Sequence, residues 1–373
     1  MLWRQAGARR AGAGFVLVMA GLLAWYTAAA HKASLDSARG VPLPVLGSEQ
    51  ACEAYRGLPP GWRQDAHAGM VALPAGRFQF GSTQGYPDER PASAAPVRMA
   101  GFWIDQTEVT VAQFAAFVAA TGYVTEAERQ GGGVVFSVPT PEQLQQRPLA
   151  WWQFVAGADW RHPGGPGSDQ AGRDALPVSF VTQADALAYA HWLGRDLPTE
   201  AEWEYAAKAG QQGDTLDDTP RDASGKPTAN YWQGSFPILN LHEDGHEGLA
   251  PVGCYPANAW GLHDTIGNVW EWTRDAYSGP HQPHMNGDTA AVAGAQHAPS
   301  QVAAGPSQGN LTPSGGGSAN GRPSGPTISM VIKGGSFLCA PDYCVRYRAS
   351  ARESQEADLA TAHIGFRTVL RTP

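Results

Sequence analysis

Two cysteines near the C-terminus, Cys339 and Cys344, have the spacing that most clearly suggests chemistry. Thiols five residues apart can form a disulfide, supply half of a zinc site, exchange disulfides or bind a soft metal such as Cu(I). No second Cys/His pair stands at zinc-finger spacing, which argues against structural zinc. Arg346 and Arg348 are expected on one strand face, where their charges would lower the thiol pKa values and favour a reactive pair.

The remaining cysteines, Cys52 and Cys254, lie far apart in the sequence. Cys52 falls in a segment with little periodicity, and we interpret it as an isolated thiol. Cys254 is interpreted as a small buried apolar residue. A bridge between them is possible, although nothing in the sequence supports it, and four cysteines are too few for a disulfide scaffold in a chain of this length.

A second set of candidate ligands carries oxygen atoms. Asn230, Asp244, Asp264 and Glu271 lie within about forty residues that are dense in Trp and Gly. Hard oxygen ligands presented by turns suit Ca²⁺. Their spacing matches no EF-hand, so ordinary Asx turns and exposed carboxylates remain the alternative.

The segment His242–His246 satisfies the H-E-x-x-H pattern of zinc proteases by letter. That pattern binds zinc only on a helix, where the two imidazoles share a face. Here Asp244-Gly245 is typical of a turn, and glycine weakens a helix by about 1 kcal/mol. We therefore expect a loop rather than a zinc protease site.

The elements that would position these residues are marked by local signals. Alternation over residues 70–81 predicts a strand with Phe78 and Phe80 on one face, and residues 329–333 predict another. Three capping sequences predict helices that begin after Thr110, Thr182 and Thr199 and end at Gly122, Gly194 and Gly210.

Composition limits the fold class and the partners. The chain has 373 residues, of which 43% are hydrophobic and only 16% are charged, with 45 Gly, 29 Pro and 13 Trp. These values predict an α+β fold rich in turns with many small aromatic clusters. The net charge of −8 and the absence of a basic stripe argue against nucleic-acid binding.

The chain is expected to have three regions. Residues 1–30 carry arginines before an apolar stretch that ends in Ala28-Ala29-Ala30, which predicts a signal peptide, with an uncleaved membrane anchor as the alternative. Residues 31–68 are interpreted as a linker and residues 69–373 as the folded domain. Within that domain, the Gly/Ser/Pro-rich segment 277–329 is expected to be a disordered insertion. The folded part would be exported, to the periplasm or outside the cell if the source is bacterial.

Several longer motifs carry a family resemblance: Thr121–Glu128, Trp160–Pro163, Leu197–Tyr205, Gly267–Trp272, Gly334–Cys339 and Ile364–Arg367. On these motifs the region from about Gly69 to Leu370 resembles the formylglycine-generating enzymes, also called sulfatase-modifying factors. The resemblance implies a variant of the C-type-lectin-like fold with little regular secondary structure. The Leu197–Tyr205 and Gly267–Trp272 motifs also occur in non-catalytic and iron-dependent relatives. The Cys-x4-Cys pair is therefore the motif that distinguishes the formylglycine-generating enzymes from those relatives.

The resemblance implies that Cys339 and Cys344 hold Cu(I) and that a substrate cysteine adds a third sulfur. Dioxygen and a thiol reductant would then convert the cysteine of a Cys-x-Pro-x-Arg motif in an unfolded or nascent sulfatase to formylglycine, with loss of sulfide. Ser336 and Tyr343 match residues that line the family's active site. Soft thiolates select Cu(I), which agrees with this assignment.

The resemblance also implies two structural calcium sites. The first would use the side chains of Asn230 and Asp244 with carbonyls of Tyr231 and His246. The second would use the side chains of Asp264 and Glu271 with carbonyls of Gly267 and Val269. The vertebrate-type enzymes have structural disulfides at positions that here hold Ala190, Ala206, Ala349 and Thr368.

Two other functions use the same pair of cysteines. One is a thiol-disulfide oxidoreductase, and the other is a non-catalytic, lectin-like binding domain in which Cys339 and Cys344 form a structural disulfide. An iron-dependent sulfoxide synthase is disfavoured, because the expected H-x3-H-x-E arrangement is missing. The copper-dependent oxidase is the leading hypothesis.

Overall fold

The computed structural model describes residues 45–211, 219–278 and 328–371, which belong to one unit that spans Leu43–Pro373. The predicted signal peptide or anchor, and all but the ends of the predicted insertion 277–329, lie outside the described residues. Among the helices within these ranges, none has the length and apolar character needed to cross a membrane. Helices and strands alternate with long irregular stretches, which confirms the predicted α+β class.

Two antiparallel sheets form from the start of the domain. β1 (Met70–Leu73), β4 (Phe102–Asp105) and β11 (Val369–Arg371) make a three-stranded sheet with β4 in the centre. β2 (Gly76–Phe78) pairs with β3 (Val97–Met99). The single strand predicted over residues 70–81 is therefore two strands, because the chain changes partner at Pro74-Ala75. Phe78 and Phe80 are both buried, as predicted.

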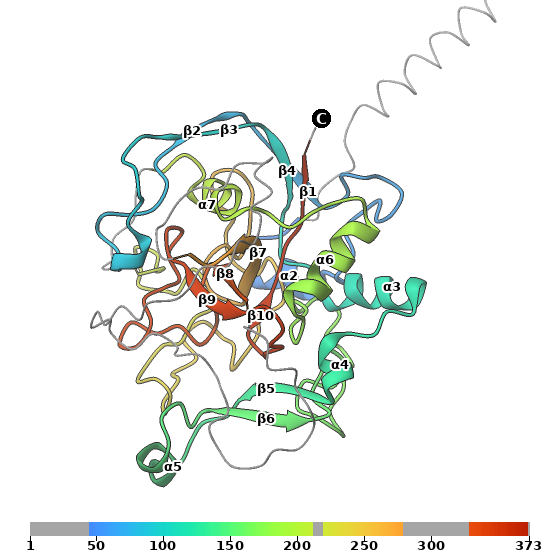
Figure 1. Cartoon of the computed structure of the whole chain (residues 1–373), viewed down its shortest axis with the longest axis vertical. Helices are drawn as coiled ribbons and strands as arrows, with labels where there is room; N and C mark the ends of the chain where they lie inside the picture. The colour runs from blue at the N-terminus through green and yellow to red at the C-terminus, as the bar shows by residue number, and fades with distance from the viewer. Residues whose placement is uncertain (1–44, 212–218, 279–327, 372–373) are drawn as a thin grey trace, which may run out of the picture. The chain divides into compact units, whose positions relative to one another are not determined.

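A four-stranded sheet leads directly to the two cysteines. Its order is β10 (Ile364–Gly365), β7 (Trp270–Ala276), β8 (Ser329–Lys333) and β9 (Glu353–Glu356), with β10 parallel to β7 and the other pairs antiparallel. β8 confirms the predicted strand. Figure 1 shows this sheet between the β1–β4–β11 sheet and the hairpin of β5 (Gly132–Phe136) and β6 (Trp152–Ala156).

The helices begin where their capping sequences predict. α3 (Val111–Thr121), α6 (Gln183–Trp192) and α7 (Glu200–Lys208) each have a threonine N-cap and a complete capping box. Gly122 ends α3 in the left-handed conformation, whereas α6 and α7 end one residue before the predicted glycines, at Leu193 and Ala209. Shorter helices are α2 (Glu49–Ala54), α4 (Glu126–Gln130), α5 (Pro141–Gln146) and the 3-10 helix η1 (Pro87–Glu89).

An aromatic cluster joins the helices to the C-terminal segment. The ring of Phe114 on α3 lies 5.2 Å from that of Trp160 and 6.0 Å from that of Tyr189 on α6, and Tyr189 lies 5.3 Å from Phe366. Phe114, Tyr189 and Phe366 are fully buried. The abundant aromatic residues thus connect irregular segments, as the composition predicted.

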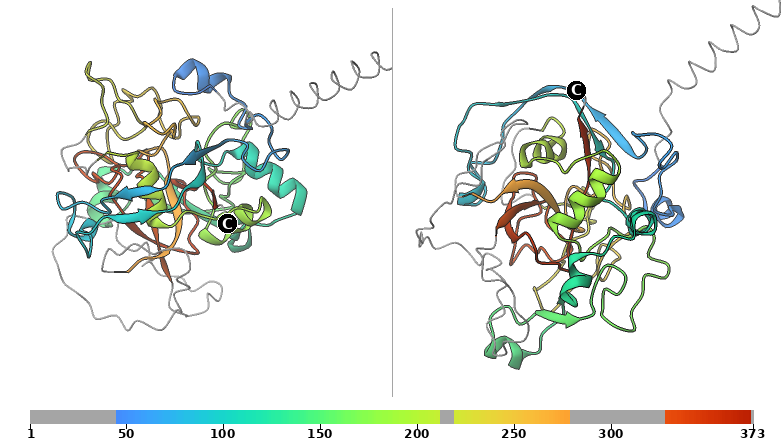
Figure 2. Two further views of the ribbon diagram at one scale, coloured as in Figure 1. Left: turned by 90° about the horizontal axis from the view of Figure 1, so that it is seen from above. Right: turned by 45° about the vertical axis from the view of Figure 1, so that its right-hand side comes forward.

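Residues 45–68 are not a linker, which corrects the sequence-based interpretation. The segment contains α2, and Cys52 on this helix forms a disulfide with Cys254, 202 residues further along the chain. The interpretation of Cys52 as an isolated thiol is therefore wrong, whereas Cys254 is buried in an apolar cluster as predicted but is also disulfide-bonded. Figure 2 shows α2 in blue beside the yellow segment that holds Cys254.

Backbone contacts extend this attachment of the N-terminal segment. The Gly47 N–H donates to the Gly253 carbonyl at 2.7 Å, and the Thr110 hydroxyl donates to the Gly57 carbonyl at 2.6 Å. A six-residue helix is too short to show a hydrophobic period, so sequence pattern alone could not detect it. The folded unit therefore begins before residue 69.

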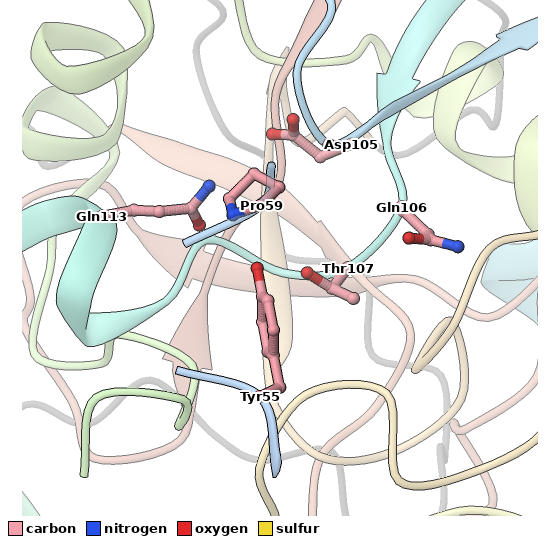
Figure 3. A pocket seen from close by; sticks show the side chains of 7 residues that line it. Tyr55, Pro59, Asp105, Gln106, Thr107 and Gln113 are labelled. Atoms are coloured by element: carbon pink, nitrogen blue, oxygen red, sulfur yellow. The ribbon is translucent and has the colours of Figure 1, made fainter. Parts of the chain in front are cut away.

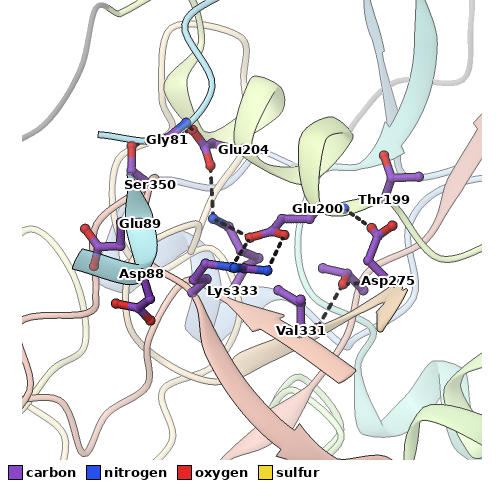
Figure 4. Close-up of polar contacts among 12 residues, drawn as sticks. Gly81, Asp88, Glu89, Thr199, Glu200, Glu204, Asp275, Val331, Lys333 and Ser350 are labelled. Carbon is purple, nitrogen blue, oxygen red and sulfur yellow. Dashed lines mark hydrogen bonds and ion pairs between the residues drawn. The ribbon is translucent and has the colours of Figure 1, made fainter. Parts of the chain in front are cut away.

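A buried ion network fastens α7 to β8. Lys333 is fully buried, and its Nζ lies 3.1 Å from a Glu204 oxygen and 3.7 Å from a Glu200 oxygen. Lys208 and Arg352 pair with the same two glutamates at 2.8 and 2.9 Å. Figure 4 shows Glu200 and Glu204 directed toward Lys333. Because every charge has an opposite partner, burial of the network is tolerated and the end of β8 is held against α7.

Candidate active site

The two candidate thiols meet in the irregular turn that follows β8. The Sγ atoms of Cys339 and Cys344 are 3.3 Å apart, the thiols are not bonded to each other, and the side chains are 0% and 5% exposed. The backbone N–H of Cys339 donates to the Ser336 carbonyl at 3.0 Å, and that of Cys344 donates to the Ala340 carbonyl at 2.9 Å. These turns bring both sulfurs to one point, where a soft metal or a third sulfur could join them.

Two glycines allow the chain to turn from β8 into this loop. Gly334 and Gly335 have φ values of +94° and +75°, which side chains other than glycine rarely adopt. A Cβ on Gly335 would also lie 2.7 Å from the Cα of Tyr347. The Trp232 N–H then donates to the Cys339 carbonyl at 2.9 Å and fixes the loop from the opposite side.

The arginines after the pair do not act as predicted. Residues 345–348 form no strand, and Arg346 and Arg348 are paired with acidic groups. Arg346 lies 3.0 Å from Asp88 and Arg348 lies 2.6 Å from Glu89. The pKa of Cys344 is raised, first by its hydrogen bond with Cys339 and then by burial, and the lowering influence of Arg346 is smaller. The prediction of a lowered thiol pKa is therefore wrong for Cys344, because its hydrogen bond with Cys339 and its burial outweigh the charge of Arg346, which is paired with Asp88.

The two accompanying site residues, Ser336 and Tyr343, belong to the same loop as the cysteines. Ser336 is fully buried, and its Oγ accepts a hydrogen bond from the Leu338 N–H at 3.2 Å. Tyr343 stacks on Phe236 with ring centroids 4.4 Å apart and meets Trp151 edge-on at 5.7 Å. Its hydroxyl has no hydrogen-bond partner, and burial followed by the neighbouring thiols raises its pKa. Phe236 and Trp151, which sequence reasoning missed, therefore form an aromatic wall beside the cysteines.

The residues of the first predicted calcium site converge around a glutamine. Asp244 accepts hydrogen bonds from the His246 N–H at 3.0 Å and from the Gln233 amide nitrogen at 2.8 Å. The same Gln233 nitrogen donates to the Tyr231 carbonyl. Asn230 lies beside this group but donates to the Gly248 carbonyl at 2.8 Å. The structure thus brings Asp244 and the Tyr231 carbonyl together around the Gln233 nitrogen, whereas the predicted His246 carbonyl lies 3.1 Å from the His242 Nδ1.

The second predicted calcium site contains a carboxylate that sequence reasoning missed. Asp264 accepts from the Gly253 N–H at 2.6 Å, and Glu271 forms a two-point ion pair with Arg367, with both contacts at 2.7 Å. Glu108 is fully buried and interacts with Asp264, and among the described residues its Oε2 accepts no hydrogen bond from an N–H or hydroxyl group. Burial, and then the charge of Asp264, raises the pKa of Glu108. Three buried carboxylates with one arginine leave a local excess of negative charge.

The two backbone ligands predicted for this site belong to buried residues in the segment just before β7. Gly267 has a φ of +76°, its N–H donates to the Gly334 carbonyl at 2.9 Å, and a Cβ there would lie 2.0 Å from the Asn230 carbonyl oxygen. Val269 is fully buried one residue before β7. Within the described ranges, no three His, Cys, Asp or Glu side chains are arranged to bind a metal by themselves. Both oxygen clusters would therefore depend on backbone carbonyls.

The H-E-x-x-H segment forms a loop, as predicted. His242 has a φ of +52°, and Glu243 pairs with Arg221 at 2.6 Å. The two imidazoles do not share a helix face, so this segment is no zinc protease site.

A small pocket lies elsewhere, where the N-terminal segment meets the domain. It is lined by Tyr55, Pro59, Gly69, Asp105, Gln106, Thr107 and Gln113, and Figure 3 shows the Tyr55 hydroxyl pointing between Gln113 and Thr107. Burial, followed by the charge of Asp105, raises the pKa of Tyr55. None of these residues belongs to the predicted site.

Comparison with known proteins adds independent information. Residues 56–372 match the sulfatase-modifying factor enzyme 1-like domain. The chain is 44% identical over 316 residues to a formylglycine-generating enzyme of Mycobacterium tuberculosis, covering 80% of this chain and 97% of that protein. It is 41% identical over 321 residues to the formylglycine-generating enzyme of Streptomyces coelicolor, covering 83% and 91%.

Two further similarities bear on activity and fold. The chain is 44% identical over 217 residues to a mouse protein named inactive C-alpha-formylglycine-generating enzyme 2, covering 56% of this chain and 69% of that one. Among solved structures, PvdO from Pseudomonas aeruginosa aligns with a TM-score of 0.51 at 21% identity, covering 89% of this chain and 99% of that one. The low identity makes this a likeness of fold alone, and it agrees with the predicted lectin-like variant.

Proposed function

Since the chain belongs to the sulfatase-modifying factor family, we propose that it converts a cysteine in a sulfatase Cys-x-Pro-x-Arg motif to formylglycine and so activates that sulfatase. The observation that carries the proposal is the buried, unbonded pair of thiols 3.3 Å apart in Cys339 and Cys344. The relatives named inactive show that family membership alone does not guarantee activity. The pair is therefore the feature to test.

We further propose that this pair binds Cu(I). Two soft sulfur donors at this separation fit a soft metal and leave a position for the substrate thiol. Bound Cu(I) would supply the electron-transfer chemistry that dioxygen requires. Cys339 and Cys344 would hold the metal as thiolates, and metal binding would release their protons despite the raised pKa of Cys344.

The protein around the pair would position the substrate and limit water. Tyr343, Phe236 and Trp151 line one side with aromatic surface, and we propose that Ser336 contributes from the buried side. In the overall reaction, one O2 accepts two electrons from the substrate cysteine and two from a thiol reductant. The substrate becomes an aldehyde, its sulfur leaves as sulfide, and one water forms. A dry site protects the reacting groups from competing hydrolysis.

The same geometry argues against the two alternative functions. Thiol exchange requires an accessible thiolate, but both sulfurs are buried and the pKa of Cys344 is raised. A binding domain with a structural disulfide requires a bond between Cys339 and Cys344, and the thiols are unbonded. The oxidase hypothesis is consistent with both the burial of the two sulfurs and the absence of a bond between them.

We also propose two structural Ca²⁺ ions. The second site fits well, because Asp264, Glu271 and the buried Glu108 leave negative charge that a cation would neutralise. The first site fits once Gln233 withdraws its amide nitrogen from Asp244 and the Tyr231 carbonyl. These ions would stabilise the fold and take no part in the chemistry.

The expected location of the protein remains an exported one. The disulfide between Cys52 and Cys254 supports this proposal, because such bonds persist mainly in oxidising compartments. The apolar stretch in residues 1–30 would direct the chain there, either as a cleaved signal peptide or as an anchor.

An assay with a synthetic peptide tests the reaction. The purified protein is incubated with Cu(I), oxygen, a thiol reductant and a Cys-x-Pro-x-Arg peptide, and the aldehyde is measured by mass spectrometry. Wild type should form the aldehyde, and Cys344→Ser should form essentially none. The double variant Cys52→Ser/Cys254→Ser, assayed below its melting temperature, controls for loss of cysteines in general and should stay active. No aldehyde from wild type, or undiminished aldehyde from Cys344→Ser, contradicts the proposal.

A further inference from the structure

Three large apolar side chains are exposed together on the loop of residues 235–241. Ile238, Leu239 and Leu241 are 54%, 53% and 56% exposed, and we call these three side chains the apolar loop. Single exposed apolar residues are common on protein surfaces, but a cluster indicates an interaction site. None of the motifs considered above accounts for this cluster.

The backbone that carries the apolar loop is held in place by hydrogen bonds. The exposure of its three side chains is therefore not a consequence of a poorly packed backbone. The N–H groups of Ile238 and Leu239 both donate to the Ser235 carbonyl at 2.9 Å, and the Leu241 N–H donates to the Gln233 carbonyl at 2.6 Å. The Trp232 indole donates to the Leu239 carbonyl at 2.9 Å. The three side chains are therefore held outward on a hydrogen-bonded frame.

This frame is attached directly to the cysteine pair. The backbone N–H of Trp232 donates to the Cys339 carbonyl, and the ring of Phe236 stacks on that of Tyr343 at 4.4 Å. The Phe236 N–H also lies 3.5 Å from an oxygen of Asp342, between the two cysteines in sequence. A chain segment that reaches the thiols past Phe236 and Tyr343 would thus have the apolar loop beside it.

We propose that the apolar loop binds apolar residues that flank the target cysteine in an extended, unfolded polypeptide. This inference rests on the proposed function and adds a binding surface to it. Because Cys339 and Cys344 are buried and the neighbouring Tyr343 is stacked on Phe236, a substrate cysteine would have to reach them on an extended segment of chain. An unfolded chain also exposes the apolar residues that a folded protein would bury, and it is therefore the partner that this surface fits.

The test uses the triple variant Ile238→Ser/Leu239→Ser/Leu241→Ser. Two labelled peptides serve as probes, one with the bare Cys-x-Pro-x-Arg motif and one with apolar residues on both sides of it. Both carry serine in place of the target cysteine, so that fluorescence anisotropy reports binding without reaction. The variant should bind the longer peptide about 10- to 100-fold more weakly and the bare motif unchanged. With cysteine peptides, its KM for the longer one should rise while kcat is preserved.

The matched control is Val124→Ser, a 48% exposed apolar residue in the turn between α3 and α4. It should bind both peptides like wild type, and both variants should keep the wild-type melting temperature. Equal binding of the longer peptide by wild type and the triple variant overturns the proposal. So does a wild-type dimer in sedimentation that the triple variant abolishes without changing peptide binding, because the surface would then join two copies. If wild type formed no aldehyde but still bound the longer peptide more tightly than the triple variant, the proposed reaction would be contradicted. The proposed binding surface would still be supported.

Discussion

At the scale of single residues, His363 gives the protein a predictable pH dependence. It is 1% exposed, stacks on Trp152 at 4.5 Å, and neither ring nitrogen has a hydrogen-bond partner. Burial lowers its pKa from 6.5 to about 3. Below pH 6.5 the unfolded chain therefore takes up a proton that the folded chain does not accept until pH about 3. The stability due to neutral His363 is complete above pH 6.5 and is lost as the pH falls toward 3.

The variant His363→Phe keeps an aromatic ring beside Trp152 and removes the titration. Relative to this variant, wild type should lose about 1 kcal/mol of unfolding free energy for each pH unit between 6.5 and 4. Urea denaturation of both proteins at several pH values measures the difference. Buried carboxylates with raised pKa values, such as Glu108 and Glu353, act in the opposite direction, but they are common to both proteins and cancel. Parallel pH profiles would contradict the assignment.

Sequence reasoning singled out two cysteines that the structure places side by side, but it did not predict their environment. Spacing alone left disulfide, thiol exchange and metal binding open for Cys339 and Cys344, and the resemblance selected one of them. The expectation about Arg346 failed because Asp88, 258 residues away in the sequence, and the nearby Glu353 both pair with that arginine. Local sequence places a residue near a thiol, whereas its effect on a pKa depends on burial and on distant partners.

At the scale of elements, the sequence predicted those whose signals are local. The starts of α3, α6 and α7 follow from threonine caps within four residues, and β8 follows from a short apolar run. α2 was missed because a six-residue helix has too few turns for periodicity. Its stability comes instead from the Cys52–Cys254 bond, a contact that spans 202 residues and has no local signature.

That bond gives a prediction for the N-terminal segment. The double variant Cys52→Ala/Cys254→Ala should lose about 2–5 kcal/mol of unfolding free energy, because the unfolded chain gains freedom and α2 loses its attachment. Guanidinium denaturation with and without dithiothreitol measures the loss. In dithiothreitol the free energy of unfolding of wild type should fall toward that of the variant. The value for the variant itself should not change. A variant as stable as wild type would show that the hydrogen bonds from Gly47 and Thr110 suffice to hold the segment.

At the scale of the whole molecule, the second oxygen cluster joins segments that are far apart in sequence. Glu108 precedes α3, Asp264 and Glu271 flank the start of β7, and Arg367 follows β10. The sequence indicated Asp264 and Glu271 because they lie close together in a turn-rich region. Glu108 could not be found in that way, since only the fold brings it to Asp264. The raised pKa of Glu108 likewise results first from its complete burial, which the sequence does not reveal.

Calcium should therefore stabilise the molecule as a whole. A ligand present at 100 times its Kd adds about 2.7 kcal/mol to the free energy of unfolding, which corresponds to roughly 4–5 °C in melting temperature for a domain of about 300 residues. Addition of EGTA should lower the melting temperature by that order, and excess Ca²⁺ should restore it. Asp264→Leu should reduce this shift by removing the second site, whereas Glu142→Gln, at an exposed position on α5, should leave it unchanged.

The pattern of loss separates calcium binding from simple destabilisation. If Asp264→Leu merely weakened the fold, its melting temperature would fall equally with and without calcium, because no ligand term would be lost. If Asp264 binds the ion, the difference in melting temperature between variant and wild type should be larger in calcium than in EGTA, where the variant loses the hydrogen bond from the Gly253 N–H but no bound ion. Isothermal titration calorimetry should then show one site fewer in the variant. An EGTA-insensitive wild type would contradict both calcium proposals, and the excess negative charge around Glu108 would then have to be removed by protonation.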